Sequence, residues 1–209
     1  MSADADRPSA DTAGADYTER LTRLTGSRLK QVLDVQRPYR WNLRRLHLGR
    51  VLDVGCGIGR NLAALDASSV GIDHNAHSVE VAARETGRTA MTTDAFLASD
   101  LAQPGGFDAL LLAHVAEHMP FDDARALLAE YAPFVRPGGA VLVICPQERG
   151  YTTDATHVNF LDGPDLEDLA RAAGLEVDRR WSFPFPRVTG RVFTYNETCL
   201  LARVPRTAA

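Results

Sequence analysis

The chain has 209 residues, 45% of them hydrophobic and 24% charged, and a formal net charge of −4 at pH 7. This length suits one α/β domain and is short for two, and no apolar run approaches the roughly 20 residues that span a bilayer. The acidic balance disfavours general nucleic-acid binding, which needs a basic surface. Three scattered cysteines argue against a disulfide framework or a cysteine-based zinc site.

The N-terminal segment is small, polar and acidic. Residues 1–16 have neither a basic nor an apolar region, which argues against a signal peptide and predicts a disordered tail. Over 17–47, leucine and valine recur at spacings of three, four and seven, with Gly26 and Pro38 as interruptions, and this pattern predicts a helical cap. We expect a cytoplasmic protein in which residues 17–209 form a single domain.

Strand and helix patterns alternate through the rest of the chain. Strands are predicted at 50–54, 68–73, 88–94, 107–115 and 140–145. Helices are predicted from a Gly-rich turn to near Leu65, at 77–87, after a cap at Asp122 and Asp123, and at 163–174. Two β-rich runs close the chain, at 175–183 and 191–204. This order predicts a doubly wound α/β sheet that ends in an antiparallel hairpin.

The strongest signal is the Gly-rich turn in VLDVGCGIGRN, at 51–61. An apolar strand runs directly into Gly55, and a helix is predicted to begin at once. Glycines let the backbone turn tightly and approach a ligand closely, while backbone N–H groups at a helix N-terminus favour an anionic group. Asp73 closes the next strand, where a carboxylate accepts hydrogen bonds from ribose hydroxyls.

The glycine spacing argues against a nicotinamide dinucleotide. The pattern is GxGxG where a dinucleotide turn reads GxGxxG, and Arg60 occupies the position of the last glycine. Asp53, inside the end of the strand, favours a cationic, amine-bearing ligand over a pyrophosphate. A nicotinamide-dependent dehydrogenase is therefore disfavoured.

Over residues 40–205 the chain resembles the class I S-adenosylmethionine (SAM)-dependent methyltransferases, and within them those of type 11 and type 12. The resemblance is carried by VLDVGCGIGR, GID (71–73), TTDAF (92–96), FDALLLAHVAEHM (107–119) and the RPGG turn (136–139). It implies a three-layer α/β fold with a doubly wound, seven-stranded, mostly parallel sheet. The last two strands would form the C-terminal antiparallel hairpin.

The resemblance also implies which residues hold SAM. Gly55, Cys56 and Gly57 would line its methionine part, and Asp53 would contact its amino group, directly or through water. Asp73 would hold the ribose. The remaining expected contacts are His74 beside the adenine or ribose (or simply exposed), Asp94 and Ala95 on the adenine, and His114.

Acid–base candidates cluster after the fourth predicted strand. A hydroxyl acceptor benefits from losing its proton to a base or to a metal-bound group. His114, Glu117 and His118 would share one face if the segment were helical from His114 onward. His157 follows later, in THVNF. These four residues are the expected catalytic set.

The same four residues resemble a metal-binding pattern. Ubiquinone-biosynthesis O-methyltransferases and small-RNA 2′-O-methyltransferases carry an ExxEH segment here, and the RNA enzymes add an HxxF-like segment. His114 replaces the first glutamate, which weakens a magnesium site because Mg²⁺ prefers oxygen ligands. A divalent metal held by His114, Glu117, His118 and His157 would more readily be zinc, manganese, iron or nickel. A metal site, a general base, and a positioning or packing role remain open.

We therefore expect a SAM-dependent methyltransferase that acts on oxygen of a small-molecule, sugar or lipid-linked acceptor. The alternative is a non-catalytic protein that binds SAM or S-adenosylhomocysteine (SAH) as a regulator or partner. Tyr195 and other aromatic residues of the C-terminal part either wall the acceptor pocket or pack the hairpin on the sheet. Tyr39 and its neighbours before the first strand either contact the SAM carboxylate or the acceptor, or form a solvated helix face. A homodimer is the one assembly considered, and neither nucleic acid nor a membrane span is expected.

Overall fold

The computed structural model describes residues 36–206. The predicted tail at 1–16 and most of the predicted helical cap at 17–47 lie outside the described residues. Within the described part, the cap region contains α3, Arg37–Arg44. Pro38 lies in the first turn of this helix, where its missing N–H group costs no hydrogen bond.

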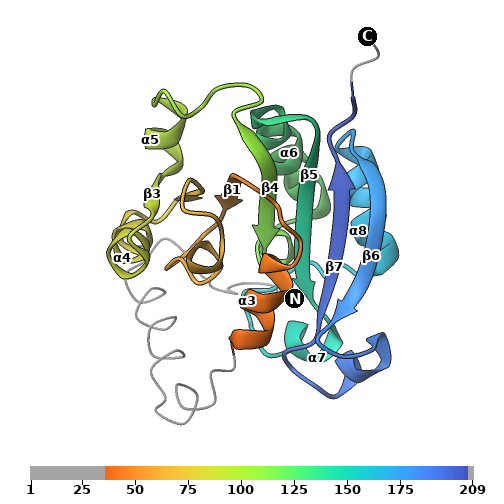
Figure 1. Ribbon diagram of the computed structural model, residues 1–209. Helices are drawn as coiled ribbons and strands as arrows, with labels where there is room; N and C mark the ends of the chain where they lie inside the picture. Colours follow the sequence, from red (N-terminus) through yellow and green to blue (C-terminus); the bar gives the residue numbers. More distant parts are fainter. Residues whose placement is uncertain (1–35, 207–209) are drawn as a thin grey trace, which may run out of the picture.

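Seven strands form one sheet in the order β3-β2-β1-β4-β5-β7-β6, as Figure 1 shows. The five strands β1 to β5 run parallel, and β7 lies antiparallel between β5 and β6. The expected doubly wound sheet with a C-terminal hairpin is confirmed. The strands are β1 Val51–Val54, β2 Val70–Asp73, β3 Thr89–Thr92, β4 Phe107–Ala113, β5 Val135–Pro146, β6 Glu176–Phe183 and β7 Glu197–Arg203.

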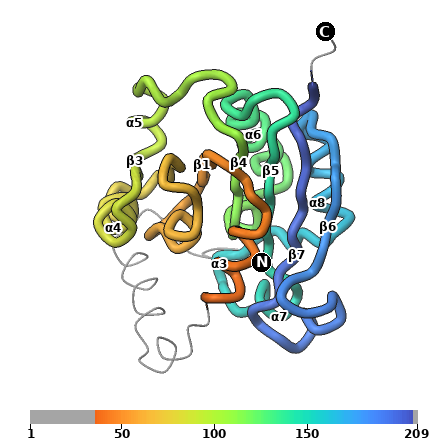
Figure 2. Tube along the Cα trace, viewed as in Figure 1, coloured from red at the N-terminus to blue at the C-terminus, as the bar shows by residue number. Residues whose placement is uncertain are grey.

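Helices cover both faces of the sheet and make the fold three-layered, as the chain trace also shows (Figure 2). The α-helices after α3 are α4 Ala76–Thr86, α5 Thr93–Leu97, α6 Phe121–Tyr131, α7 Glu148–Tyr151 and α8 Gly163–Ala172. Short 3₁₀ helices are η1 Leu62–Ala64, η2 Ala116–His118, η3 Ala132–Phe134 and η4 Arg187–Arg191. Between residues 36 and 206, no helix is both long and apolar enough to cross a membrane.

The buried strand β4 shows why the core has two halves. Leu110 and Leu112 point into a core shared with α5, α6 and α8, whereas Leu111 points into a core shared with α3 and η1. Successive side chains of a strand face opposite sides. An uninterrupted apolar run is therefore needed wherever both faces are covered.

Two of the predicted helices are capped in identifiable ways, and the predicted stop at Gly87 is confirmed. Asn75 caps α4 by accepting a hydrogen bond from the Ser78 N–H, and Gly87 ends the helix in the left-handed region. Helix α8 begins with a reciprocal capping box between Asp162 and Asp165.

The prediction of an α-helix immediately after the Gly-rich turn is wrong. Gly55, Gly57 and Gly59 all have positive φ, at 73°, 52° and 81°, so the right-handed helical conformation cannot start before Gly59 is passed. Turns and the three-residue η1 follow instead.

Three other predicted boundaries are also wrong. β3 stops at Thr92, whose side chain accepts a hydrogen bond from the Ala95 N–H and so begins α5. Asp122 and Asp123 lie in the first turn of α6, and Pro120 is its N-cap residue. The last predicted β-rich run, 191–204, is a strand only from Glu197 to Arg203. The residues before Glu197 form the end of η4 and a loop.

Candidate functional site

The Gly-rich turn lies at the carboxyl edge of the sheet, directly after β1. A Cβ atom placed on Gly55 would lie 2.4 Å from Cγ2 of Val115, so only glycine allows this close approach to the segment after β4. The carboxyl ends of β2, β4 and β5 meet at the same edge. Ligands of open α/β sheets bind in this position.

The N–H groups of the turn are used within the protein. Those of Gly55 and Cys56 donate to the Ile72 carbonyl at 2.8 and 3.0 Å. The Gly57 N–H donates to Oδ2 of Asp73 at 2.9 Å. These groups are therefore used within the protein and are not available to a pyrophosphate.

Asp53 is a buried carboxylate on β1, directly before the Gly-rich turn. It is 1% exposed, and within residues 36–206 its Oδ2 atom accepts no hydrogen bond. Burial, and then the negative charge of Asp73, raise the pKa of Asp53 to about 7. A buried acceptor without a partner costs free energy, so a nearby cation would relieve both the charge and the unmet hydrogen bond.

The other expected cofactor residues differ in exposure. The side chain of Cys56 is buried against Val79 and Ala82, so Cys56 would contact a ligand through its backbone and not through its thiol. His74 is mostly exposed, with Nδ1 3.3 Å from Oδ1 of Asp73. Asp94 and Ala95 are exposed in the first turn of α5, just past the end of β3.

His114 does not start a helix. It adopts a left-handed backbone conformation with φ of 59°, which separates it from the 3₁₀ turn η2 that carries Glu117 and His118. The prediction that all three share one helical face is wrong. Histidine tolerates this region better than most residues because its side chain can bond locally.

Both ring nitrogens of His114 contact carboxylates. Nε2 lies 2.9 Å from Oε1 of Glu197, and Nδ1 lies 3.3 Å from Oε1 of Glu117. Burial would lower the pKa of His114, but these two contacts outweigh it and raise the pKa to about 10. The ring is therefore an imidazolium at neutral pH and cannot act there as a proton acceptor.

Glu117 is fully buried at the centre of this cluster. Its pKa would be raised by burial, but the contact with His114 and its positive charge lower it. Neither carboxylate oxygen accepts a hydrogen bond from the described residues. Glu117 is thus an ionised group whose remaining lone pairs face the neighbouring imidazoles.

His118 and His157 form a pair whose Nε2 atoms have no hydrogen-bond partner among residues 36–206. Their ring centroids are 4.8 Å apart, because the Glu117 carbonyl accepts the N–H groups of Val158 and Asn159 and brings that loop to η2. Nδ1 of His157 is 2.7 Å from the Tyr151 carbonyl, and Nδ1 of His118 is 3.3 Å from the carbonyl of Thr156.

A carbonyl oxygen can only accept, so in the neutral state each Nδ1 carries the hydrogen and each Nε2 keeps a lone pair. Burial lowers the pKa of His118, which keeps it neutral at pH 7. One oxygen of Glu117 and one nitrogen of each of His118 and His157 lie within 4.8 Å of one another. The structure thus groups three of the four predicted metal ligands and leaves out His114.

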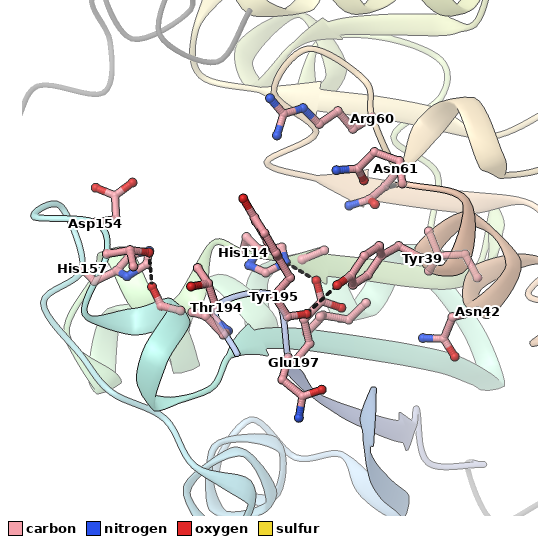
Figure 3. Close-up of a pocket in the computed structure, with 18 of the residues that line it drawn as sticks. Tyr39, Asn42, Arg60, Asn61, His114, Asp154, His157, Thr194, Tyr195 and Glu197 are labelled. Carbon is pink, nitrogen blue, oxygen red and sulfur yellow. Dashed lines mark hydrogen bonds and ion pairs between the residues drawn. The ribbon is translucent and has the colours of Figure 1, made fainter. Parts of the chain in front are cut away.

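A cavity of about 320 Å³ lies beside these groups. Within the described part of the chain, its wall includes His114, His118 and His157 and leaves out Asp53 and Asp73. Figure 3 shows how the wall is assembled from distant segments: Asp154 and His157 on one side, Tyr39 and Asn42 on the other, Arg60 and Asn61 after the Gly-rich turn, and Tyr195 between them.

A family model described as a methyltransferase domain matches residues 17–179, well over half of the chain. The chain belongs to this methyltransferase family. The membership confirms the class that the sequence resembles, the class I SAM-dependent methyltransferases. The expected enzyme class and methyl donor are confirmed with it.

Curated relatives of this methyltransferase include ubiquinone biosynthesis O-methyltransferases from two bacteria. The ubiquinone biosynthesis O-methyltransferase of Ralstonia nicotianae is 29% identical over 174 residues, which are 71% of this chain and 72% of the relative. The one from Rhizobium etli is 35% identical over 100 residues, 45% of this chain. This methyltransferase spans only 40% of the length of the Rhizobium relative.

Solved structures share the fold of this methyltransferase. A SAM-dependent methyltransferase from Archaeoglobus fulgidus superposes with a TM-score of 0.65 at 18% identity, covering 90% of this chain and 99% of the other. Magnesium protoporphyrin IX methyltransferase from Synechocystis PCC 6803, solved with bound SAH, gives 0.65 at 18% identity, covering 92% and 96%.

The sequence analysis of this methyltransferase did not identify two residues of the site. Glu197, on β7, is separated from His114 by 83 residues. Thr156 donates its hydroxyl hydrogen to Asp154 at 2.8 Å and lies 3.0 Å from Nδ1 of His118, whose hydrogen it accepts. Neither residue belongs to a motif, so no local pattern could have identified it.

Replacing Gly55 with alanine should destabilise the methyltransferase more than the same change at Gly87. Both glycines have a left-handed φ, so each substitution carries a backbone penalty of about 1–2 kcal/mol. Only at Gly55 would the new methyl group also collide with Val115, since nothing lies within 4 Å of a Cβ at Gly87. Urea unfolding of both variants measures the difference, and equal losses would contradict the close packing of the turn.

Proposed function

We propose that this methyltransferase transfers the methyl group of SAM to an oxygen atom of a small-molecule, sugar or lipid-linked acceptor. The observation that carries the proposal is the pair His118 and His157, whose Nδ1 atoms are held by carbonyls and whose Nε2 lone pairs remain available. An acceptor hydroxyl can give its proton to such a nitrogen. The O-methyltransferase name of the Ralstonia relative supports an oxygen acceptor.

The Gly-rich turn would hold the methionine end of SAM. Asp53 is a buried carboxylate with an unmet acceptor atom, which fits the ammonium group of SAM, directly or through a water molecule. Gly55 and Gly57 would lie beside the same end, with the Cys56 backbone between them. Because the turn's N–H groups are already used, a cationic ligand fits this position better than a pyrophosphate.

The Asp73 carboxylate would hold the ribose. It accepts the N–H groups of Gly57 and Asn75 at 2.9 Å each. A carboxylate has about four lone-pair sites, so with the His74 ring also 3.3 Å from Oδ1, about one remains for a ribose hydroxyl. His74, beside Asp73, and the exposed start of α5 with Asp94 and Ala95 would flank the adenine.

Methyl transfer needs alignment more than acid–base strength, because the sulfonium of SAM carries its own leaving group. In our proposal the acceptor oxygen attacks the methyl carbon while His118 or His157 takes the hydroxyl proton at Nε2. His114, already protonated, holds Glu117 and Glu197 in place. It is therefore a positioning residue and not the base.

A non-catalytic SAM-binding protein is the alternative. It would need the Gly-rich turn but no free proton acceptor in the cavity wall. The tautomers of His118 and His157 favour an enzyme. A histidine with only a packing role would not need to keep its Nε2 lone pair available.

SAM should bind more tightly as the pH rises through the pKa of Asp53. A nearby ammonium favours the ionised carboxylate, so below pH 7 binding must first expel a proton. With a pKa of about 7, the ionised fraction and hence the affinity rise about eightfold from pH 6 to pH 7.5. Isothermal titration with SAM across this range measures the effect.

The Asp53→Asn variant should bind SAM weakly and without this pH dependence. Asp122→Asn, an exposed carboxylate on α6, is the matched control and should keep the wild-type profile. In the absence of ligand, the raised pKa of Asp53 has the opposite effect on stability. The free energy of unfolding should fall as the pH rises from 3.8 to about 7, because the folded state holds the proton more tightly. A flat affinity profile for the wild type would contradict the role of Asp53.

His118→Gln and His157→Gln should each lower kcat, by about 10²–10⁴ for the residue that takes the proton. Neither change should alter the Kd for SAM more than twofold, since neither residue belongs to the Gly-rich turn. SAH release with a panel of catechols, sugars and lipid-linked alcohols measures turnover. His77→Gln, an exposed histidine on α4, is the control.

Tight SAM binding without turnover on any acceptor would favour the non-catalytic alternative. Unchanged kcat in both histidine variants would instead remove these residues from the proposed mechanism and leave the methyltransferase assignment intact.

A divalent metal ion is a second occupant that the same residues fit. Glu117 offers a buried carboxylate that is ion-paired with His114 but accepts no hydrogen bond from the described residues. His118 and His157 each offer one ring nitrogen, while a carbonyl orients the other nitrogen of the same ring. Two imidazoles and one carboxylate suit zinc, manganese or iron better than Mg²⁺. Such an ion would lower the pKa of a bound acceptor hydroxyl.

If this site holds metal, the full-length protein should retain about one equivalent of Zn²⁺ or Mn²⁺ after desalting, and much less Mg²⁺. Glu117→Gln and His157→Gln should abolish retention, while His77→Gln should not. Elemental analysis by mass spectrometry gives the answer independently of turnover. No retained metal in the wild type would leave the histidines as proton acceptors only.

A further inference from the structure

One face of the molecule exposes bulky apolar side chains beside the cavity. We name it the rim face, and it comprises the outer side of α3 and the β6–β7 connection, residues 184–196. Of the seven large hydrophobic residues exposed in the described part of the chain, five lie here: Trp41, Phe185, Val188, Val192 and Tyr195. Trp41 is 57% exposed, Val188 68% and Val192 77%.

The two segments both lie at the lower end of the molecule in Figure 1, and several contacts join them. The Trp41 ring stacks on Phe183, with centroids 6.4 Å apart, immediately before the connection. The Tyr39 hydroxyl donates to the Tyr195 carbonyl. Phe193 then packs edge-to-face between its neighbours Phe185 and Tyr195, at 5.3 and 5.8 Å. These contacts join α3 to the connection and hold Trp41, Phe185 and Tyr195 in place.

The rim face is also basic, although the whole chain is acidic. Residues 36–45 and 184–196 contain six arginines and no aspartate or glutamate. The chain has 23 basic and 27 acidic residues in total, so the remainder carries 17 basic residues against 27 acidic ones. The acidic character lies wholly outside these two segments.

Among the described residues, an ion pair with a carboxylate is seen for one arginine of the two segments. Glu148 of α7 neutralises Arg187, with nitrogen–oxygen distances of 2.6 and 2.7 Å. On α3, the exposed Arg37, Arg44 and Arg45 share one helical side with Trp41, at spacings of four, seven and eight from Arg37. Arg45 also stacks over the Trp41 ring, 4.9 Å from its centroid.

We propose that the rim face docks the protein on a membrane surface that contains anionic lipid. Exposed valine and aromatic side chains can enter the boundary between headgroups and acyl chains, while arginines meet lipid phosphates. An acidic protein partner would use the arginines but leave Val188 and Val192 without an apolar environment. Nucleic acid would do the same.

Docking would bring the cavity opening to the lipid interface. Gln36, Tyr39 and Tyr195 belong both to the rim face segments and to the cavity wall. An amphiphilic acceptor could then reach the cavity without crossing water. The docking itself does not depend on the reaction proposed above, and it is tested without turnover.

Tryptophan fluorescence offers a direct test, because the chain has only two tryptophans, Trp41 and Trp181. Trp181→Phe leaves Trp41 as the single reporter, and the Trp181 Nε1 atom makes no hydrogen bond that the change would remove. The full chain carrying this change is mixed with vesicles of equal parts phosphatidylglycerol and phosphatidylcholine, or of phosphatidylcholine alone. With the anionic vesicles we expect a blue shift of Trp41 emission and co-sedimentation, both weakened by salt.

Two double variants separate the apolar and charged contributions. Val188→Asp/Val192→Asp and Arg44→Glu/Arg45→Glu should each reduce vesicle binding at least tenfold, and circular dichroism checks that they fold. Leu97→Asp is the control, since Leu97 is exposed on α5 beside β3, at the opposite edge of the sheet. It should bind like the parent protein.

The proposal is overturned if anionic vesicles are not bound, or if both double variants bind them as well as the parent does. Equal binding to pure phosphatidylcholine would overturn the requirement for anionic lipid. Sedimentation velocity tests the alternative that a second copy of this chain binds the rim face. A dimer that Val188→Asp/Val192→Asp converts to a monomer would support that alternative and overturn the proposal.

Discussion

The hydrogen bonds between the Gly-rich turn and β2 are the constraint on which the cofactor side of the structure depends. Three consecutive N–H groups, from Gly55 to Gly57, are satisfied by the Ile72 carbonyl and the Asp73 carboxylate. This arrangement fixes the turn against the sheet without help from a ligand. It also explains why a Gly-rich turn, so often an anion site, here leaves a buried carboxylate, Asp53, as its unmet group.

The acceptor side depends on a different interaction, the imidazolium of His114 between two carboxylates. It joins the end of β4 to β7 through Glu197 and to η2 through Glu117. A fully buried Glu117 would be costly without this charge. With it, Glu117 stays ionised beside His118, whose pKa is lowered by burial, so His114 and His118 differ in protonation state and in role.

The two sides meet at one edge of the sheet and share the cavity between them. Arg60 and Asn61 come from the turn that follows β1, while His118 and His157 come from loops after β4 and β5. The same edge carries the rim face. If our proposals hold, cofactor, acceptor and membrane would all approach from one end of the molecule, and the opposite end would serve only to hold the strands.

The sequence by itself determined the features that depend on near neighbours. The glycine spacing and Asp73 act within one unit of two neighbouring strands, and the uninterrupted apolar run of β4 acts within a single strand. Together with the order of strand and helix patterns and the two β-rich runs at the C-terminus, they predicted the sheet, its hairpin and the methyltransferase class. It failed where local rules were overridden: positive φ at the three glycines prevented an α-helix, and His114 left the helical conformation. Only the tertiary structure decided which imidazoles are charged, because Glu197 lies 83 residues from His114 and a pKa depends on distance in space. The rim face has the same origin, since Trp41 and Val192 become one surface only when α3 packs beside β6 and β7.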